Sequence, residues 1–185
     1  VVLGGEDAVD ATRMEQLQAY TTGTVTRMGG DNRYETAALV AGELADPGTV
    51  YVASGQDYPD ALAAAARAGA GDHPVLLVKQ DSVPSVVRSA LTDLAPESIV
   101  LLGGPVSVDD TVETVLEGYA PVERVAGDDR YHTAALLSSS SETAEQAFVA
   151  SGQNWPDALA GAAVAGHLEA PILLTKSDSV PGATV

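Results

Sequence analysis

The chain has 185 residues and a mass of 18.8 kDa, the size of one or two ordinary domains. Hydrophobic residues make up 45% of it and the mean hydropathy is +0.09, which excludes wholesale disorder, and the absence of cysteine excludes disulfide scaffolds, thiol catalysis and cysteine-ligated zinc. Nine Lys and Arg face 26 Asp and Glu, and the formal net charge of −17 argues against broad nucleic-acid binding because polyphosphates are repelled.

No apolar run approaches the roughly 18 residues that a membrane span needs. Residues 1–5 lack the basic start and long apolar stretch of a signal peptide, so we expect any export signal to lie outside this sequence. An acidic chain whose only lysines are Lys79 and Lys176 fits a high-salt or an extracellular setting, and a solvated acidic face without a specific partner explains it equally well.

Short apolar runs alternate with helical patterns along the chain. Strands are predicted at 25–28, 50–53, 74–78 and 98–102; helices are predicted over 37–44, from 57–60 onward, over 86–94 and over 110–116. This order predicts an α/β fold, a parallel sheet with helices on both faces. Glycine-containing loops and helix N-termini then gather at the carboxyl edge of the sheet, where we expect any site.

The chain contains an internal repeat with an offset of 97 residues. Residues 27–39, 54–63, 74–77 and 81–84 return without a gap at 124–136, 151–160, 171–174 and 178–181. A partial copy opens the chain, because Val-Val-Leu-Gly-Gly at 1–5 matches 100–104 at an offset of 99. We therefore predict the C-terminal part of one repeat at 1–24, a complete repeat at 25–121 and the N-terminal part of another at 122–185.

Two Arg-Tyr pairs, Arg33-Tyr34 and Arg130-Tyr131, begin helices at the expected carboxyl edge. A cation there can grip an anionic sugar or phosphate group. The alternative is structural: Arg33 pairs with Asp60, and Arg130 pairs with Asp157, as bridges between neighbouring loops.

The segments 57–60 and 154–157 have the residues of helix starts. Asp57 and Asn154 are predicted N-caps, and Asp60 and Asp157 complement the helix dipole. The alternative makes these carboxylates metal ligands or an acid–base pair. The Gly-Gly pairs at 4–5, 29–30 and 103–104 resemble phosphate-binding turns, but they match neither nucleotide fingerprint and favour plain turns.

The remaining chemistry-bearing residues form no catalytic constellation. His73, His132 and His167 share no repeat position or metal spacing, and Ser54 and Ser151 lie outside a nucleophile elbow. The serine run 138–141 is expected at the polar end of a helix or in a loop. The sequence therefore predicts a module that is not an enzyme and has no cofactor.

Four motifs, Gly-Asp-x-Arg-Tyr-x-Thr-Ala, Ser-Gly-Gln-x-x-Pro-Asp-Ala-Leu-Ala, Pro-(Val/Ile)-Leu-Leu and Val-Leu-Leu-Gly-Gly, resemble the type 2 cell-wall-binding repeat of Gram-positive surface-layer proteins and wall-associated amidases. The resemblance covers essentially the whole chain. It implies tandem flavodoxin- or toprim-like modules, commonly three in a pseudo-threefold arrangement, that anchor an exported surface protein non-covalently to an anionic wall polymer or envelope glycan. By position, it implies these ligand candidates and neighbours: Arg27, Arg33, Tyr34, Asp60, Arg124, Arg130, Tyr131 and Asp157.

Several alternatives stay open. The Pro-x-Leu-Leu motif at 74–77 and 171–174 has been linked to anchoring in this family, whereas its residues alone predict a buried strand. The strong acidity favours a different ligand or a bridging divalent cation. Two alternative functions are a self-assembling repeat of a surface layer or filament, and the anchoring part of a wall hydrolase such as an amidase. Segments 1–24 and 122–185 nearly rebuild one module, which predicts head-to-tail association as the alternative to a pseudo-threefold.

Overall fold

The computed structural model describes residues 1–139 and 144–185. The strands are β1 (Val2–Leu3), β2 (Arg27–Met28), β3 (Thr49–Ser54), β4 (Val75–Val78), β5 (Ser98–Leu102), β6 (Val122–Val125), β7 (Phe148–Ser151) and β8 (Ile172–Thr175). The helices are α1 (Ala11–Gln18), α2 (Arg33–Ala41), α3 (Pro59–Ala70), α4 (Ser85–Leu94), α5 (Asp110–Leu116), α6 (Arg130–Ser139) and α7 (Trp155–His167), with a short 3-10 turn at Gly182–Thr184. Among these residues, no helix is long and apolar enough to cross a membrane.

Most predicted elements are confirmed, including the strand at 98–102 and the helix at 110–116. The predicted strand at 25–28 shortens to the two residues of β2. The serine run continues α6 as far as Ser139, and its other residues lie outside the described part of the chain.

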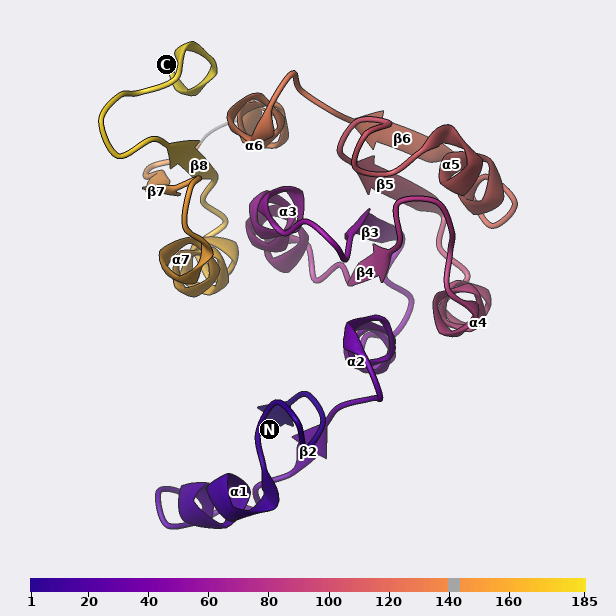
Figure 1. The fold of residues 1–185 in the computed structure, drawn as a ribbon, viewed down its shortest axis with the longest axis vertical. Helices are drawn as coiled ribbons and strands as arrows, with labels where there is room; N and C mark the ends of the chain where they lie inside the picture. The colour runs from indigo at the N-terminus through magenta and orange to yellow at the C-terminus, as the bar shows by residue number, and fades with distance from the viewer. Residues whose placement is uncertain (140–143) are drawn as a thin grey trace.

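The central sheet has four parallel strands in the order β4-β3-β5-β6 and is covered by helices on both faces. Side chains of β3 alternate between the two faces, as expected for a buried strand. Val50 and Val52 pack into a core with α2, α4 and α5, whereas Tyr51 and Ala53 pack into a core with α3, α6 and α7. The predicted α/β fold with helices on both faces is confirmed (Figure 1).

Two smaller parallel sheets flank the central one. The pair β1-β2 repeats the geometry of β5-β6, and the pair β7-β8 repeats that of β3-β4. The sheets do not follow the boundaries of the sequence copies. Strand β2 opens the first full copy but pairs with β1, and β6 opens the next copy but pairs with β5. The first strand of a copy thus completes the sheet of the copy before it.

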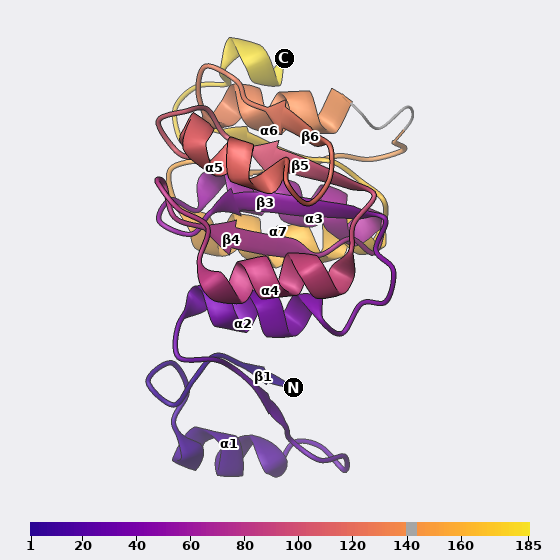
Figure 2. The ribbon, with the colours of Figure 1, turned by 90° about the vertical axis from the view of Figure 1, so that its right-hand side faces the viewer.

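Helices α3 and α7, which are equivalent in the repeat, pack side by side, and α3 lies between the central sheet and the β7-β8 sheet (Figures 1 and 2). They come close together at Gly69 and Gly166, again equivalent positions. A Cβ atom added at Gly166 would lie 3.2 Å from the Cα atom of Gly69 and 3.2 Å from the Ala66 carbonyl oxygen. Small residues therefore let the two backbones touch.

Candidate functional site

The loops before α2 and α6 are built in the same way. The side chain of Asn32 accepts hydrogen bonds from the backbone N–H groups of Tyr34 (3.0 Å) and Glu35 (3.1 Å), and Asp129 does the same for Tyr131 (3.0 Å) and His132 (2.9 Å). These N-caps satisfy orphan donors of the first turn. They place Arg33 and Arg130 at the first residue of each helix.

Arg33 and Arg130 also make the same contact. The Nη1 atom of Arg33 donates to the Gly55 carbonyl oxygen at 2.6 Å, and Nη1 of Arg130 donates to that of Gly152 at 2.8 Å. Within the described residues this is the one hydrogen bond that each guanidinium group makes. Since a guanidinium group has five N–H donors, both retain donors for a ligand.

The position that accepts this bond has no room for a side chain. A Cβ atom at Gly55 would lie 2.6 Å from a ring carbon of Tyr34, and one at Gly152 would lie 2.6 Å from the same carbon of Tyr131. The tyrosine ring therefore packs directly on the loop that holds the arginine. Tyr131 is buried, so it supports the site from within.

Arg124 is placed differently. Its Nε and Nη2 atoms donate to one Glu113 oxygen at 3.0 and 2.8 Å, and Nη1 donates to the carbonyl oxygens of Gly103 (2.9 Å) and Val108 (2.8 Å). Nη2 also lies 3.5 Å from Asp110, and only 15% of the side chain is exposed. Its donors are thus used within the protein to bind the loop between β5 and α5.

Arg27 holds the equivalent loop at the start of the chain. Its Nη1 atom donates to the carbonyl oxygens of Gly4 (2.6 Å) and Gly5 (2.9 Å), and its Nη2 atom donates to that of Val9. The resemblance places Arg27 and Arg124 with Arg33 and Arg130 as ligand candidates. The structure separates the two pairs, because Arg27 and Arg124 already donate hydrogen bonds to backbone carbonyl oxygens.

Asp60 lies where two copies meet. Its carboxylate forms a side-chain hydrogen bond with the buried Thr133 and faces Arg130, both from α6. Burial raises its pKa, and the nearby Asp57 adds to this, whereas Arg130 and the Thr133 bond act in the opposite direction. A Cβ atom at Gly103 would lie 2.5 Å from the Asp60 Oδ2 atom, so the β5 loop approaches it closely as well.

The predicted ion pairs of Arg33 with Asp60 and of Arg130 with Asp157 are absent from the described residues. Asp60 faces the arginine of the following copy because α6 packs against α3. Asp157 is exposed on α7. The sequence could not show this, since an offset repeat does not say which copies are neighbours across a joint.

The predicted capping by Asp57 and Asn154 is also corrected. Tyr58 is the N-cap residue of α3, and the Asn154 side chain makes no capping bond although it holds the N-cap position of α7. The Ser54 hydroxyl instead accepts from the N–H groups of Gln56 (3.2 Å) and Asp57 (3.3 Å). A serine at the end of a strand can accept these bonds from the turn that follows, which competes with capping by the next residues.

Two residue types of this edge were not among the sequence candidates. Gln56 and Gln153 each tie the loop after β3 or β7 to the next loop, accepting from the N–H groups of Gln80 (2.8 Å) and Ser177 (3.2 Å). Lys79 and Lys176 directly follow β4 and β8, and the Lys176 Nζ atom lies 5.7 Å from the centre of the Tyr131 ring. The available signal was that both pairs recur at the repeat offset.

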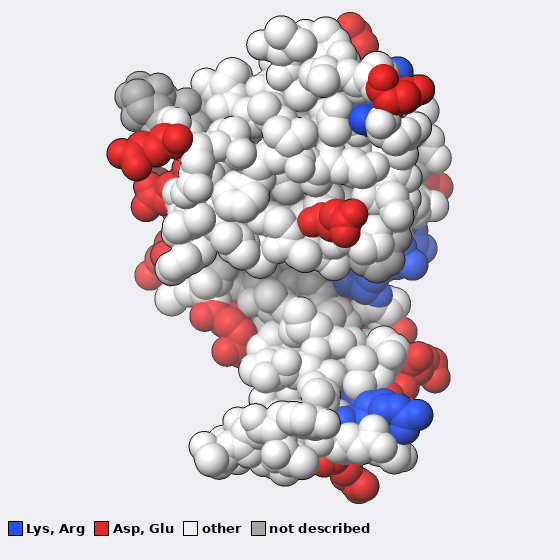
Figure 3. Space-filling model, turned by 90° about the vertical axis from the view of Figure 1, so that its left-hand side faces the viewer, with Lys and Arg blue, Asp and Glu red and all other residues white. Residues whose placement is uncertain are grey.

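Positive charge lies along one edge of the face shown in Figure 3. On the face shown in Figure 3, the Lys and Arg atoms lie along the right-hand side of the view, whereas Asp and Glu atoms occur on both sides. The chain therefore offers cations at one edge despite its net charge of −17.

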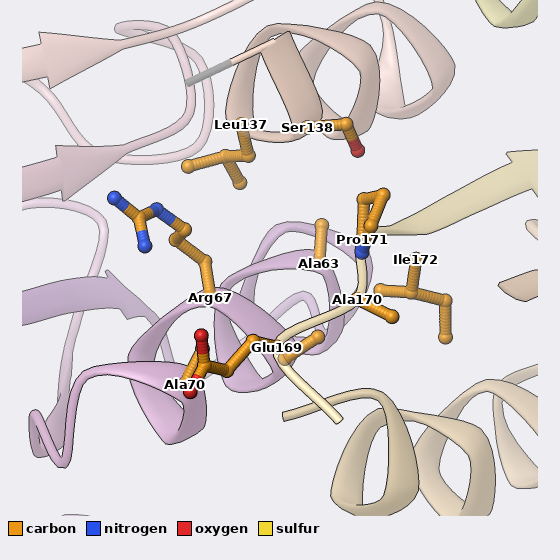
Figure 4. Close-up of a pocket in the computed structure, with 10 residues that line it drawn as sticks. Ala63, Arg67, Ala70, Leu137, Ser138, Glu169, Ala170, Pro171 and Ile172 are labelled. Carbon is orange, nitrogen blue, oxygen red and sulfur yellow. The ribbon is translucent and has the colours of Figure 1, made fainter. Parts of the chain in front are cut away.

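Two hollows of the molecule lie beside α3. Figure 4 shows a cavity between α3, α6 and the loop before β8, with a volume of about 10 Å³, room for about one water molecule. A groove of about 1010 Å³ runs between α2, α3 and the loop after β1, and it reaches Leu159 of α7. Its walls include Ala37, Val40, Ala65 and Ala68, and Arg33 lies on its border. The small cavity also has Arg67, Ser138 and Glu169 in its lining, and the groove has Glu6, Asp7, Asp31 and His73.

No group of three or more His, Cys, Asp or Glu in the described residues is placed to hold a metal ion. A bridging divalent cation therefore stays a prediction from the sequence.

Family comparisons agree with this duplicated architecture. The chain belongs to the Cell wall binding domain 2 (CWB2) family, which matches residues 27–113 and 124–184. It is a cell-wall-binding module, and its place is outside the cell in association with the wall.

The chain is 31% identical over 184 residues to the amidase enhancer of Bacillus subtilis, covering 99% of this chain and 25% of that protein. It is 27% identical over 168 residues to N-acetylmuramoyl-L-alanine amidase LytC of Bacillus subtilis, covering 90% of this chain and 34% of that protein. The structure of Cwp8 from Clostridium difficile matches with a TM-score of 0.86 and 28% identity, over 98% of this chain and 32% of that one. The chain thus spans about a quarter to a third of the length of these relatives.

Proposed function

We propose that this module anchors its parent protein by non-covalent binding of an anionic wall polymer at the carboxyl edge of its sheets, without catalysing a reaction. The observation that carries the proposal is the repeated placement of Arg33 and Arg130. Each donates to a single glycine carbonyl oxygen, retains N–H donors and is the first residue of a helix. A guanidinium group binds carboxylate and phosphate oxygens through paired hydrogen bonds, which suits an acidic polymer.

We also propose that the repeats are arranged around a pseudo-threefold axis, in preference to head-to-tail chains. Positions that are equivalent under a rotation can touch only close to its axis, and Gly69 touches Gly166. The apolar groove bordered by α2, α3 and Leu159 offers space beside this contact for a third helix of the same kind.

A parent protein that acts on the wall is a second candidate. Two relatives are an amidase and an amidase enhancer, and this chain matches only part of each. In such a protein this module would hold a separate catalytic or regulatory domain close to its substrate. Self-assembly into a surface layer is the remaining alternative, and it predicts concentration-dependent association without glycan.

Co-sedimentation with isolated Gram-positive cell envelope tests the proposal. The protein should sediment with intact envelope, remain in solution after the anionic polymer is stripped, and bind less as NaCl is raised. Parallel samples with calcium and with a chelator test the bridging cation. Binding that survives stripping would contradict the proposal.

The matched variants are Arg33→Ala with Arg130→Ala, and Arg13→Ala with Arg88→Ala. Both remove two exposed or half-exposed positive charges, but the second pair takes them from α1 and α4. We expect about a tenfold loss of affinity for the first pair, about 1.4 kcal/mol, and less than about twofold for the second. Equal losses would show that only net charge matters.

A further inference from the structure

The two lysines of this chain occupy the same position in the repeat. Lys79 and Lys176 are 97 residues apart, and each directly follows the last strand of its copy, β4 or β8. The other seven cations are arginines. A chain that uses lysine only twice thus uses it both times at the end of the Pro-x-Leu-Leu strand, on the carboxyl edge.

In the second copy, this lysine is joined to Arg130 through Gly152. The Gly152 carbonyl accepts from Arg130 Nη1 at 2.8 Å, and the Gly152 N–H donates at 2.9 Å to the carbonyl of Thr175, the residue before Lys176. The Lys176 Nζ atom lies 5.7 Å from the centre of the Tyr131 ring, which itself packs on Gly152. One glycine therefore joins the Arg130 side chain to the backbone directly before Lys176, and the Tyr131 ring lies beside both this glycine and the Lys176 amine.

The first copy has the same framework. The Gly55 carbonyl accepts from Arg33 Nη1 at 2.6 Å, and the Gly55 N–H donates at 2.8 Å to the carbonyl of Val78, which precedes Lys79. The Tyr34 ring packs on Gly55 as the Tyr131 ring does on Gly152. The framework of arginine, glycine and tyrosine around the lysine-bearing strand end is thus repeated in both copies.

Neither lysine amine forms an ion pair with a carboxylate of the described residues. The ion pairs among the described residues involve Arg124 and His132. Asp81 and Asp178 lie two residues after the lysines, and each accepts a hydrogen bond from the next serine hydroxyl, at 3.0 Å from Ser82 and 3.1 Å from Ser179. Both lysines are exposed.

We propose that Lys79 with Arg33, and Lys176 with Arg130, form two equivalent sites, each binding one phosphate group of the wall polymer. A phosphate group presents several acceptor oxygens, so the planar guanidinium fork can take two and the compact ammonium group another. A carboxylate is already satisfied by the fork alone. This inference rests on the proposed polymer binding and adds the second cation and the chemical group recognised.

Lysine NMR gives a direct test, because the chain has only two lysines. Reductive methylation with a 13C label keeps the charge and yields one signal from each lysine and one from the α-amine of Val1. Titration with long-chain polyphosphate at 0.15 M salt should shift both lysine signals and leave the Val1 signal in place. Neutral dextran should shift none, and polygalacturonate, which has carboxylates, should shift them much less.

Single arginine variants check that the pairs are correct. Arg33→Ala should reduce the response of Lys79 only, and Arg130→Ala that of Lys176 only. Lysine signals that do not respond to polyphosphate would overturn the inference. An equal response to polygalacturonate would overturn the choice of phosphate, and an equal shift of the Val1 signal would show unspecific charge attraction.

Envelope co-sedimentation separates this inference from the proposed function. Lys79→Gln with Lys176→Gln should weaken binding about tenfold, whereas Arg13→Gln, which removes an exposed charge from α1, should change it less than about twofold. If the unaltered protein binds envelope and the lysine variant binds equally well, the phosphate sites are wrong and the anchoring stands. If the unaltered protein ignores envelope but its lysine signals respond to polyphosphate, the sites stand and the anchoring fails.

Discussion

Individual arginines of one motif have different tasks in this protein. Arg27 and Arg124 recur at the repeat offset as faithfully as Arg33 and Arg130, so the sequence could nominate all four and could not rank them. The two pairs differ in the number of backbone carbonyl oxygens that accept hydrogen bonds from each arginine. The loops that follow β1 and β5 point several carbonyl oxygens at Arg27 and Arg124, whereas one glycine carbonyl faces each of the others.

At the same scale, Asp60 should make stability depend on pH. Burial raises its pKa above the ordinary 3.8, so the folded state binds a proton more tightly than the unfolded chain does. By linkage, the contribution of Asp60 to the free energy of unfolding improves as pH falls through the raised pKa towards 3.8, and it is unfavourable above that window. Relative to Asp60→Asn, the unaltered protein should therefore gain stability on acidification, as measured by urea unfolding at a series of pH values.

Asp157→Asn provides the control, because this residue holds the equivalent position but is exposed. Its difference from the unaltered protein should change little with pH. A difference for Asp60→Asn that is equally flat would mean that the joint between the copies does not bury the carboxylate in solution.

At the scale of elements, apolar patterning predicted the long strands and helices well. Strand β5 has a continuous run of apolar residues after Ser98, and α5 has a capping Asp109 before its first turn. Residues within or next to each of these elements therefore indicate where it lies. Strand β2 is different, since two residues carry no information about their partner strand. Its pairing with β1 is made by backbone hydrogen bonds, and Arg27 adds side-chain bonds to the carbonyl oxygens of the loop after β1.

The contact between α3 and α7 can be tested with two glycines of one helix. An alanine at either position should gain about 1 kcal/mol from helix propensity. At Gly161 the nearest atom to the new Cβ is a flexible Ile172 carbon at 3.5 Å, so the gain should be kept. At Gly166 the neighbours are backbone atoms at 3.2 Å, so Gly166→Ala should lose that gain and Gly166→Val should destabilise by about 1–3 kcal/mol.

The measurement is the free energy of unfolding in urea. The order Gly161→Ala, unaltered protein, Gly166→Val from most to least stable is the expected result. Equal stability of Gly166→Val and the unaltered protein would contradict close packing of the two helices.

At the scale of the whole molecule, 26 acidic residues against nine basic ones create self-repulsion. Salt screens this repulsion, so the urea midpoint should rise between about 0.05 and 1 M NaCl. Envelope binding should fall over the same range, because it depends on attraction between opposite charges. A variant with the exposed Glu6, Asp7 and Glu15 changed to amides should show a smaller rise, whereas an unchanged salt dependence would point to a general effect of salt on apolar burial.

The fold class and the repeat could be predicted at this scale, but the arrangement of the copies could not be derived from the residues. The α/β order follows from local periodicity, whereas the approach of Gly69 to Gly166 depends on how two amphipathic surfaces dock. The same limit applies to Asp60, whose partner Arg130 lies in another copy. The contacts between copies are therefore the part of the structure that could least be predicted from the sequence.

The exchange of strands between copies has a consequence for how such proteins grow and are trimmed. A cut at the sequence boundary before β6 would leave β5 without its edge partner and would strip the β5 loop of the Arg124 contacts. A cut after β6, near Gly127, would leave the four-stranded sheet whole. Gene rearrangements that add or delete copies, and proteases that release them, should therefore leave intact modules only when the break falls after this strand. The unit that is duplicated in the sequence and the unit that folds thus differ in their boundaries by one strand.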